Sequence, residues 1–192
     1  MLKIFLNTNQ KIQVFFFEDA RTYVKKCKKK YDLIILDLFA DGDPEHLTTK
    51  EFYQNLDNCL NDNGVVLSNS LMDFSNELAL NSVLSTFSSQ FDDLHYFHIP
   101  DAEVNNLYII AGKNGTSKRV QGLNLSLDSI PKGIKPTVIK VLRNAKKFKK
   151  EDFIDQNILY DEKNQYSIIF AKILPKYKKL LHSLVSSRIL IN

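Results

Sequence analysis

Residues 31–53 have the sequence Tyr-Asp-Leu-Ile-Ile-Leu-Asp-Leu-Phe-Ala-Asp-Gly-Asp-Pro-Glu-His-Leu-Thr-Thr-Lys-Glu-Phe-Tyr. The apolar run from Leu33 to Leu36 is too short for a helix and rich in isoleucine, which predicts a strand buried on both faces, as in a parallel sheet. The strand ends at Asp37. Because ligands bind outside the carboxyl ends of strands in open α/β sheets, we expect a polar cleft there.

The loop after this strand supplies further polar groups, namely Asp41, Asp43, Glu45 and His46. It closes at Thr48, three residues before Glu51, which is the spacing of a capping box. This spacing predicts a helix over residues 49–61, with the Asn63-Gly64 pair as a turn or helix stop.

Strands and helices alternate on both sides of this stretch. We predict strands at 12–17, 33–37 and 65–67, helices from Ala20 and over 76–90, and an antiparallel pair at 95–99 and 107–111. This order indicates an α/β fold with a parallel sheet and helices on both faces. Turn-rich sequence after Gly112 divides the chain into a domain of residues 1–115 and an extension of residues 116–192, with helices starting at Pro136 and after Pro175.

The charge is distributed unevenly along the 192 residues. Residues 1–131 carry 12 Lys and Arg against 17 Asp and Glu, whereas residues 132–192 carry 14 against 5. A basic tail of this kind attracts nucleic acid, an anionic surface or the acidic part of its own molecule. The basic run 146–150 contains a single aromatic residue, so nucleic-acid binding would depend on charge alone and is not our main expectation.

Several classes of protein are excluded or disfavoured. No apolar run approaches 18 residues, and the first residues are too short for a signal-peptide core, so we expect a cytoplasmic protein without a membrane span. Two cysteines, Cys27 and Cys59, do not form a disulfide framework and are expected as free thiols. His95 and His98 alternate along one strand without a third ligand nearby, so no metal site is expected.

The strand ending in Asp37, its acidic loop, the Pro-x-His-Leu-x-Thr segment of residues 44–49 and Glu-Phe-Tyr at 51–53 together resemble the spermidine synthase (polyamine aminopropyltransferase) family. The resemblance is to divergent bacterial members and covers roughly residues 11–113, with a weaker match near 157–162. It implies a methyltransferase-like Rossmann fold that binds S-adenosylmethionine or its decarboxylated form. The implied activity is transfer of an aminopropyl or methyl group to an amine, as in polyamine biosynthesis.

The resemblance also implies roles for individual residues. Asp37 matches the first aspartate of the family's Asp-x-x-Asp motif, which handles the proton and charge of the attacking amine. Asp19 and Ala20 match the position where an aspartate accepts a hydrogen bond from the adenine amino group. The alternative for Asp19 is that it caps the helix that follows.

Asp41, Asp43, His46 and Tyr160 are the implied substrate-binding residues. The chain departs from the family here, because Ala40 stands where the second aspartate of the motif would be and Tyr160 stands in place of a threonine. The alternative for His46 is a structural loop histidine that forms hydrogen bonds without binding substrate.

The family's glycine-rich turn has no counterpart, since no glycine precedes Gly42. The strand 33–37 would then have an open edge, which residues 12–17 or a second chain in a homo-oligomer would cover, unless the sequence is a fragment. Two alternatives to a transferase follow: a non-catalytic descendant that acts as a binding or assembly subunit, and a binder of anionic surfaces through the basic tail.

Overall fold

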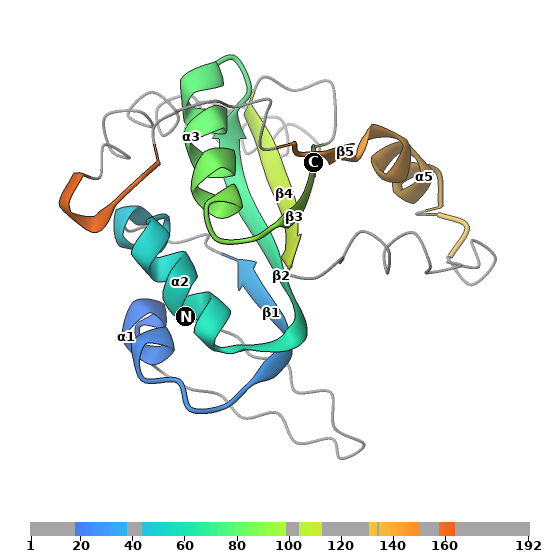
Figure 1. Ribbon diagram of the computed structural model, residues 1–192. Helices are drawn as coiled ribbons and strands as arrows, with labels where there is room; N and C mark the ends of the chain where they lie inside the picture. The colour runs from blue at the N-terminus through green and yellow to red at the C-terminus, as the bar shows by residue number, and fades with distance from the viewer. Residues whose placement is uncertain are drawn as a thin grey trace, which may run out of the picture.

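The computed structural model describes residues 18–37, 44–98, 104–112, 131–133, 135–149 and 158–163 (Figure 1). Its elements in chain order are α1 (Ala20–Lys25), β1 (Tyr31–Asp37), the 3-10 helix η1 (Pro44–Leu47), α2 (Lys50–Asn58), β2 (Leu60–Asp73), α3 (Glu77–Ser88), β3 (Asp93–His98), β4 (Val104–Gly112), α5 (Lys135–Asn144), β5 (Lys146–Lys147) and the 3-10 helix η4 (Asp161–Lys163). The strand predicted at 12–17 and the helix predicted after Pro175 lie outside the described residues.

The strands form a five-stranded sheet in the order β1-β2-β4-β3-β5. β1 and β2 are parallel, and the other pairs are antiparallel. The predicted antiparallel pair is confirmed as β3 and β4, and β4 lies between β2 and β3. Within the described ranges β1 pairs with β2 alone, so it is the edge strand of this part of the sheet.

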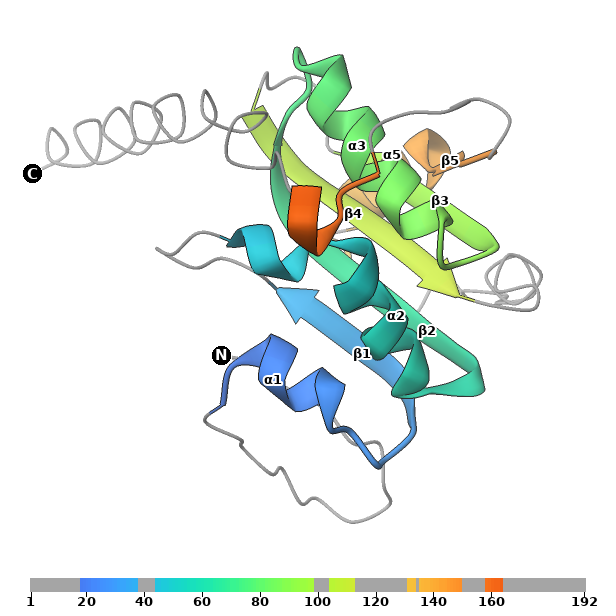
Figure 2. The ribbon, with the colours of Figure 1, turned by 60° about the vertical axis from the view of Figure 1, so that its left-hand side comes forward.

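Helices cover the two faces of the sheet unequally. α1, α2 and α3 lie on one face, and α5 lies on the other side, next to β3 and β5 (Figures 1 and 2). Ile34 and Leu36 of β1 are buried, whereas Leu33 is 41% exposed. The expectation that β1 is buried on both faces is therefore wrong. Successive side chains of a strand point to opposite faces, so Leu33 lies on the face opposite to that of the buried Ile34 and Leu36.

α2 begins one residue later and ends three residues earlier than predicted. Thr49, rather than Thr48, is the N-cap, and its hydroxyl accepts a hydrogen bond from the amide of Phe52. The chain enters β2 at Leu60, so Asn63-Gly64 lies inside a strand and not at a turn. Gly64 sits where the β1–β2 register is irregular, and a Cβ there would lie 2.8 Å from the Tyr31 carbonyl oxygen. The close backbone approach explains the glycine.

Two segments from beyond residue 115 complete the core. Phe148 and Leu159 are both buried, and the amide of Phe148 donates to the Leu94 carbonyl at 2.9 Å. α5 confirms the helix predicted at Pro136. The division of the chain at residue 115 remains a prediction, although these segments share one core with the first half.

The pair of strands β3 and β5 carries a partly buried titratable group, His95. His95 lies opposite Lys147 in the register, and burial lowers the pKa of His95 below its usual 6.5, with Lys147 adding to the effect and Asp93 opposing it. Below about pH 6.5 the unfolded chain would therefore take up a proton that the folded chain resists binding, which favours unfolding.

We expect the free energy of unfolding to fall as the pH drops below 6.5. In His95→Gln the change of this free energy with pH should be smaller by at most about 1.4 kcal/mol per pH unit, the limit for one proton. Urea denaturation at a series of pH values measures it. An identical slope in the variant would contradict the assignment.

Candidate functional site

The first cluster of site residues lies where β1 ends. Asp37 is the last residue of β1 and is exposed, as predicted for a strand-end carboxylate. The register places it beside Asn69 of β2, whose Nδ2 donates to Asp37 Oδ1 at 3.1 Å. The other end of the Asn69 amide, Oδ1, is buried and has no hydrogen-bond partner among the described residues. A buried acceptor left open beside a carboxylate favours a ligand that carries N–H donors.

Sequence reasoning did not select Asn69. A signal was present, because a polar Ser-Asn-Ser segment follows the buried run 65–67 and parallel neighbours end at the same edge of a sheet. In the register, the neighbour of Asn69 on its other side is Tyr108 of β4, which stacks on Phe97 at 5.0 Å between ring centroids. Asp37 is thus the first of three neighbouring residues across β1, β2 and β4.

The second cluster forms around the start of α1. Asp19 is the N-cap of α1 and accepts a hydrogen bond from the amide of Thr22 at 2.9 Å, so it does cap this helix, and its role toward adenine stays a prediction. His46 Nε2 lies 3.3 Å from Asp19 Oδ2. The hydrogen bond from the Thr22 backbone lowers the pKa of Asp19, and His46 adds to this against the opposing effect of burial. Two predicted site residues, Asp19 and His46, are therefore in contact, and Ala20 is buried beside them.

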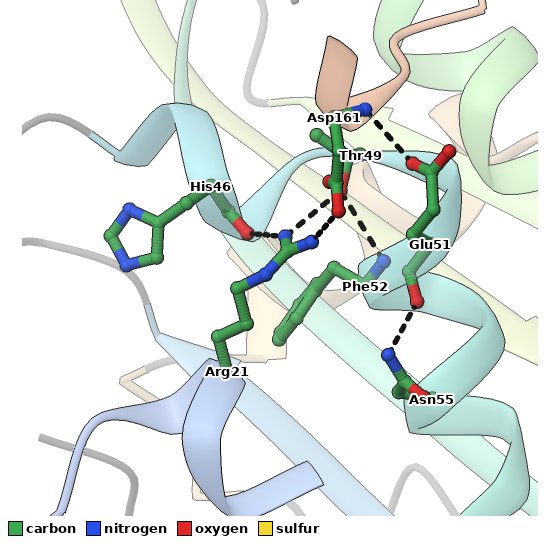
Figure 3. Close-up of polar contacts among 7 residues, drawn as sticks. All are labelled: Arg21, His46, Thr49, Glu51, Phe52, Asn55 and Asp161. Atoms are coloured by element: carbon green, nitrogen blue, oxygen red, sulfur yellow. Dashed lines mark hydrogen bonds and ion pairs between the residues drawn. The ribbon is translucent and has the colours of Figure 1, made fainter. Parts of the chain in front are cut away.

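Arg21 joins four segments of the chain, although nothing in the sequence pattern singled it out (Figure 3). Its guanidinium donates to the Thr49 hydroxyl at 3.1 Å and to the backbone carbonyl of His46, and it pairs with the carboxylate of Asp161. The Arg21 side chain is only 12% exposed. Burial raises the pKa of Asp161, but hydrogen bonds from Thr49 and Arg21 outweigh this and lower it below its usual value.

The segment 158–163, which we call the strap, lies across the N-terminus of α2. The Lys50 amide donates to the Leu159 carbonyl at 2.8 Å, and the Leu159 amide donates to the Thr86 hydroxyl at 3.0 Å. The Asp161 amide donates to Glu51 Oε2 at 3.0 Å. Glu51 is available for this contact because Thr49, and not Thr48, caps the helix, which removes Glu51 from the position that a capping box needs.

Tyr160 lies on the strap, with the ammonium nitrogen of Lys50 5.5 Å from its ring centroid. Figure 2 shows the strap, η1, the start of α1 and the tip of β1 toward the same end of the sheet. Asp37 thus lies at the carboxyl end of β1, and the elements that carry Asp19, His46 and Tyr160 lie toward the same end of the sheet. The remaining predicted residues, Asp41 and Asp43, lie outside the described residues.

Within the described part of the chain, no group of three or more His, Cys, Asp or Glu side chains could hold a metal ion. None of the helices in the described ranges is long and apolar enough to cross a membrane.

Parallel strands followed by an antiparallel pair, with helices on both sides, define a methyltransferase-like Rossmann fold. A probable spermidine synthase from Corynebacterium glutamicum has this fold in common with the chain, with a TM-score of 0.52 and 18% identity over 75% of this chain and 52% of that one. The chain belongs to the spermine/spermidine synthase family, whose domain model matches residues 1–120.

Two curated relatives agree with this assignment. The chain is 30% identical to the polyamine aminopropyltransferase of Vibrio vulnificus over 127 residues, which are 64% of this chain and 41% of the relative. It is 33% identical to the enzyme of the same name from Thermoplasma volcanium over 81 residues, 42% of this chain and 30% of the relative. The matched part is therefore less than half the length of either relative.

Proposed function

We propose that the protein acts as an aminopropyltransferase of the spermidine synthase type, which moves an aminopropyl group from decarboxylated S-adenosylmethionine to an amine. The observation that carries this proposal is the pair formed by Asp37 and Asn69. It places a carboxylate beside a buried amide oxygen that has no hydrogen-bond partner among the described residues, and both can accept hydrogen bonds from an amine. Membership of the family supplies the reaction class.

In the proposed reaction the amine nitrogen attacks the carbon next to the sulfonium sulfur. A C–N bond forms, the C–S bond breaks, and its electron pair stays on sulfur, which leaves as the neutral thioether methylthioadenosine. The proton lost by the amine passes to Asp37, because an amine attacks only in its unprotonated form. Asn69 donates to Asp37 Oδ1, and we assign the other carboxylate oxygen to the amine proton.

The donor nucleoside is assigned to the start of α1. Asp19 accepts from the adenine amino group in this proposal, as the family resemblance implies. His46 contacts the same carboxylate, so a bound adenine would share or replace that contact. The rest of the donor is positioned so that its sulfonium meets the amine near Asp37, and positioning is the main contribution of the protein to such a reaction.

Calorimetric titration with decarboxylated S-adenosylmethionine, S-adenosylmethionine and methylthioadenosine tests the donor site. We expect dissociation constants of about micromolar order and a loss of about tenfold or more in Asp19→Asn, since one good hydrogen bond to a charged group contributes about 1.5–3 kcal/mol. Asparagine still caps a helix, so the variant keeps α1.

Glu18→Gln is the matched control, because Glu18 directly precedes Asp19 and its carboxylate pairs with the exposed Lys26. No binding of any of the three compounds at millimolar concentration would overturn the proposed function. Mass analysis of the amine product then distinguishes aminopropyl transfer from methyl transfer, which is the second outcome the family fold allows.

A further inference from the structure

The strap is attached to the rest of the molecule in two different ways. At its start, Leu159 is buried, and its backbone exchanges hydrogen bonds with Lys50 and Thr86. At its end, Asp161 is 37% exposed and is held by Glu51 and by the ion pair with Arg21. Tyr160 lies between these two attachments, so the loss of either would change where its side chain can be.

Arg21 contacts the strap and η1 at the same time. Its guanidinium donates to the carbonyl of His46, in η1, and to the carboxylate of Asp161, on the strap (Figure 3). It also lies two residues after Asp19, whose carboxylate faces the imidazole of His46. One side chain therefore connects η1 and the strap to the helix that begins beside Asp19.

We propose that Arg21 is a positioning residue for the acceptor amine: its ion pair with Asp161 holds Tyr160 in place, and its hydrogen bond to the His46 carbonyl holds η1. The inference rests on the proposed function for the identity of the acceptor. The placement of the strap by Arg21 is testable without any activity.

The chemistry of the contact explains why an arginine stands here. Its acceptors are a carboxylate, a main-chain carbonyl and a hydroxyl, which come from three segments and surround a side chain that is 12% exposed. A guanidinium presents several N–H donors in a fixed plane, so it can satisfy such a set at once. Lysine would keep the charge but not the geometry, and methionine would keep only the length and the apolar stem.

Hydrogen exchange rates of backbone amides report on the two attachments of the strap separately, because each attachment includes a different amide. In Arg21→Met we expect the Asp161 amide, bound to Glu51, to exchange about tenfold faster or more, since the ion pair that holds this end is lost. The Leu159 amide, bound to the Thr86 hydroxyl, should stay within about twofold of the parent. Asp161→Ala should reproduce both results while leaving α1 unchanged.

Lys26→Met is the matched control, because it removes a cation just after α1 whose partner Glu18 is not part of the strap. It should change neither amide. Unchanged protection of the Asp161 amide in Arg21→Met would overturn the inference. Equal acceleration at Asp161 and Leu159 would also overturn it, because Arg21 would then only stabilise the fold.

Kinetic measurements distinguish positioning of the acceptor from a role in stability alone. In Arg21→Met the KM for the acceptor amine should rise about tenfold, whereas the dissociation constant of the donor should stay within about twofold, with Arg21→Lys intermediate. Equal losses on both sides would count against positioning of the acceptor. A parent protein that binds no donor would overturn the proposed function, and the exchange result would still decide the role of Arg21.

Discussion

Asp37→Asn is expected to reduce the rate of aminopropyl transfer by a factor of about 10² to 10⁴, the contribution of a positioned general base. The amide has nearly the shape of the carboxylate and can still accept a hydrogen bond from Asn69, but it cannot take the proton of the amine. The affinity for the donor should be nearly unchanged, because the donor is assigned to Asp19. Initial rates of methylthioadenosine release and calorimetric donor titration measure the two quantities.

Asp32→Asn provides the matched control. Asp32 is an exposed carboxylate on the same strand and bonds only to the side chain of Asn61 at 2.6 Å within the described contacts. Its variant should keep the parent rate. If Asp37→Asn turns over as fast as the parent protein, Asp37 is not the base and the proton goes elsewhere.

Phe87→Ala is expected to lower the free energy of unfolding by about 3–5 kcal/mol, the usual cost of removing a buried phenylalanine ring. Phe87 on α3 is 1% exposed and stacks on Tyr53 of α2 at 4.0 Å between ring centroids. Its loss would leave a cavity between two helices that must both pack on the sheet. Equilibrium urea denaturation gives the free energy from the midpoint and slope.

Leu78→Ala on the same helix serves as the control, because Leu78 is 46% exposed and should cost no more than about 0.5 kcal/mol. A loss below about 1 kcal/mol in Phe87→Ala would mean that the interface between α2 and α3 collapses to fill the space.

The strand–helix order could be predicted from local sequence because each element carries its own periodicity. β1, α3 and the β3–β4 pair all lie where the sequence indicates them. The cap of α2 was misplaced by one residue since Thr48 and Thr49 are equally able to cap, and only tertiary contacts select Thr49. The burial of β1 on both faces could not be predicted correctly, because a run of apolar residues does not show which neighbouring element covers each face of the strand.

The candidate site could be predicted only in part, for a related reason. Asp37 follows a strand and could be recognised locally. The pair of Arg21 and Asp161 joins residues 140 positions apart, and no periodicity links two such positions. The open amide oxygen of Asn69 depends on the β1–β2 register, which the sequence does not specify to the residue.

The late arrival of Phe148 and Leu159 in the core has a consequence for synthesis on the ribosome. The strands β1 to β4 leave the exit tunnel well before β5 and the strap, so the nascent domain first exposes the apolar positions that these segments cover. The outer edge of β3, which pairs with β5 in the finished sheet, is also free during that interval. The nascent domain can therefore bury these apolar positions only after β5 and the strap have also left the exit tunnel.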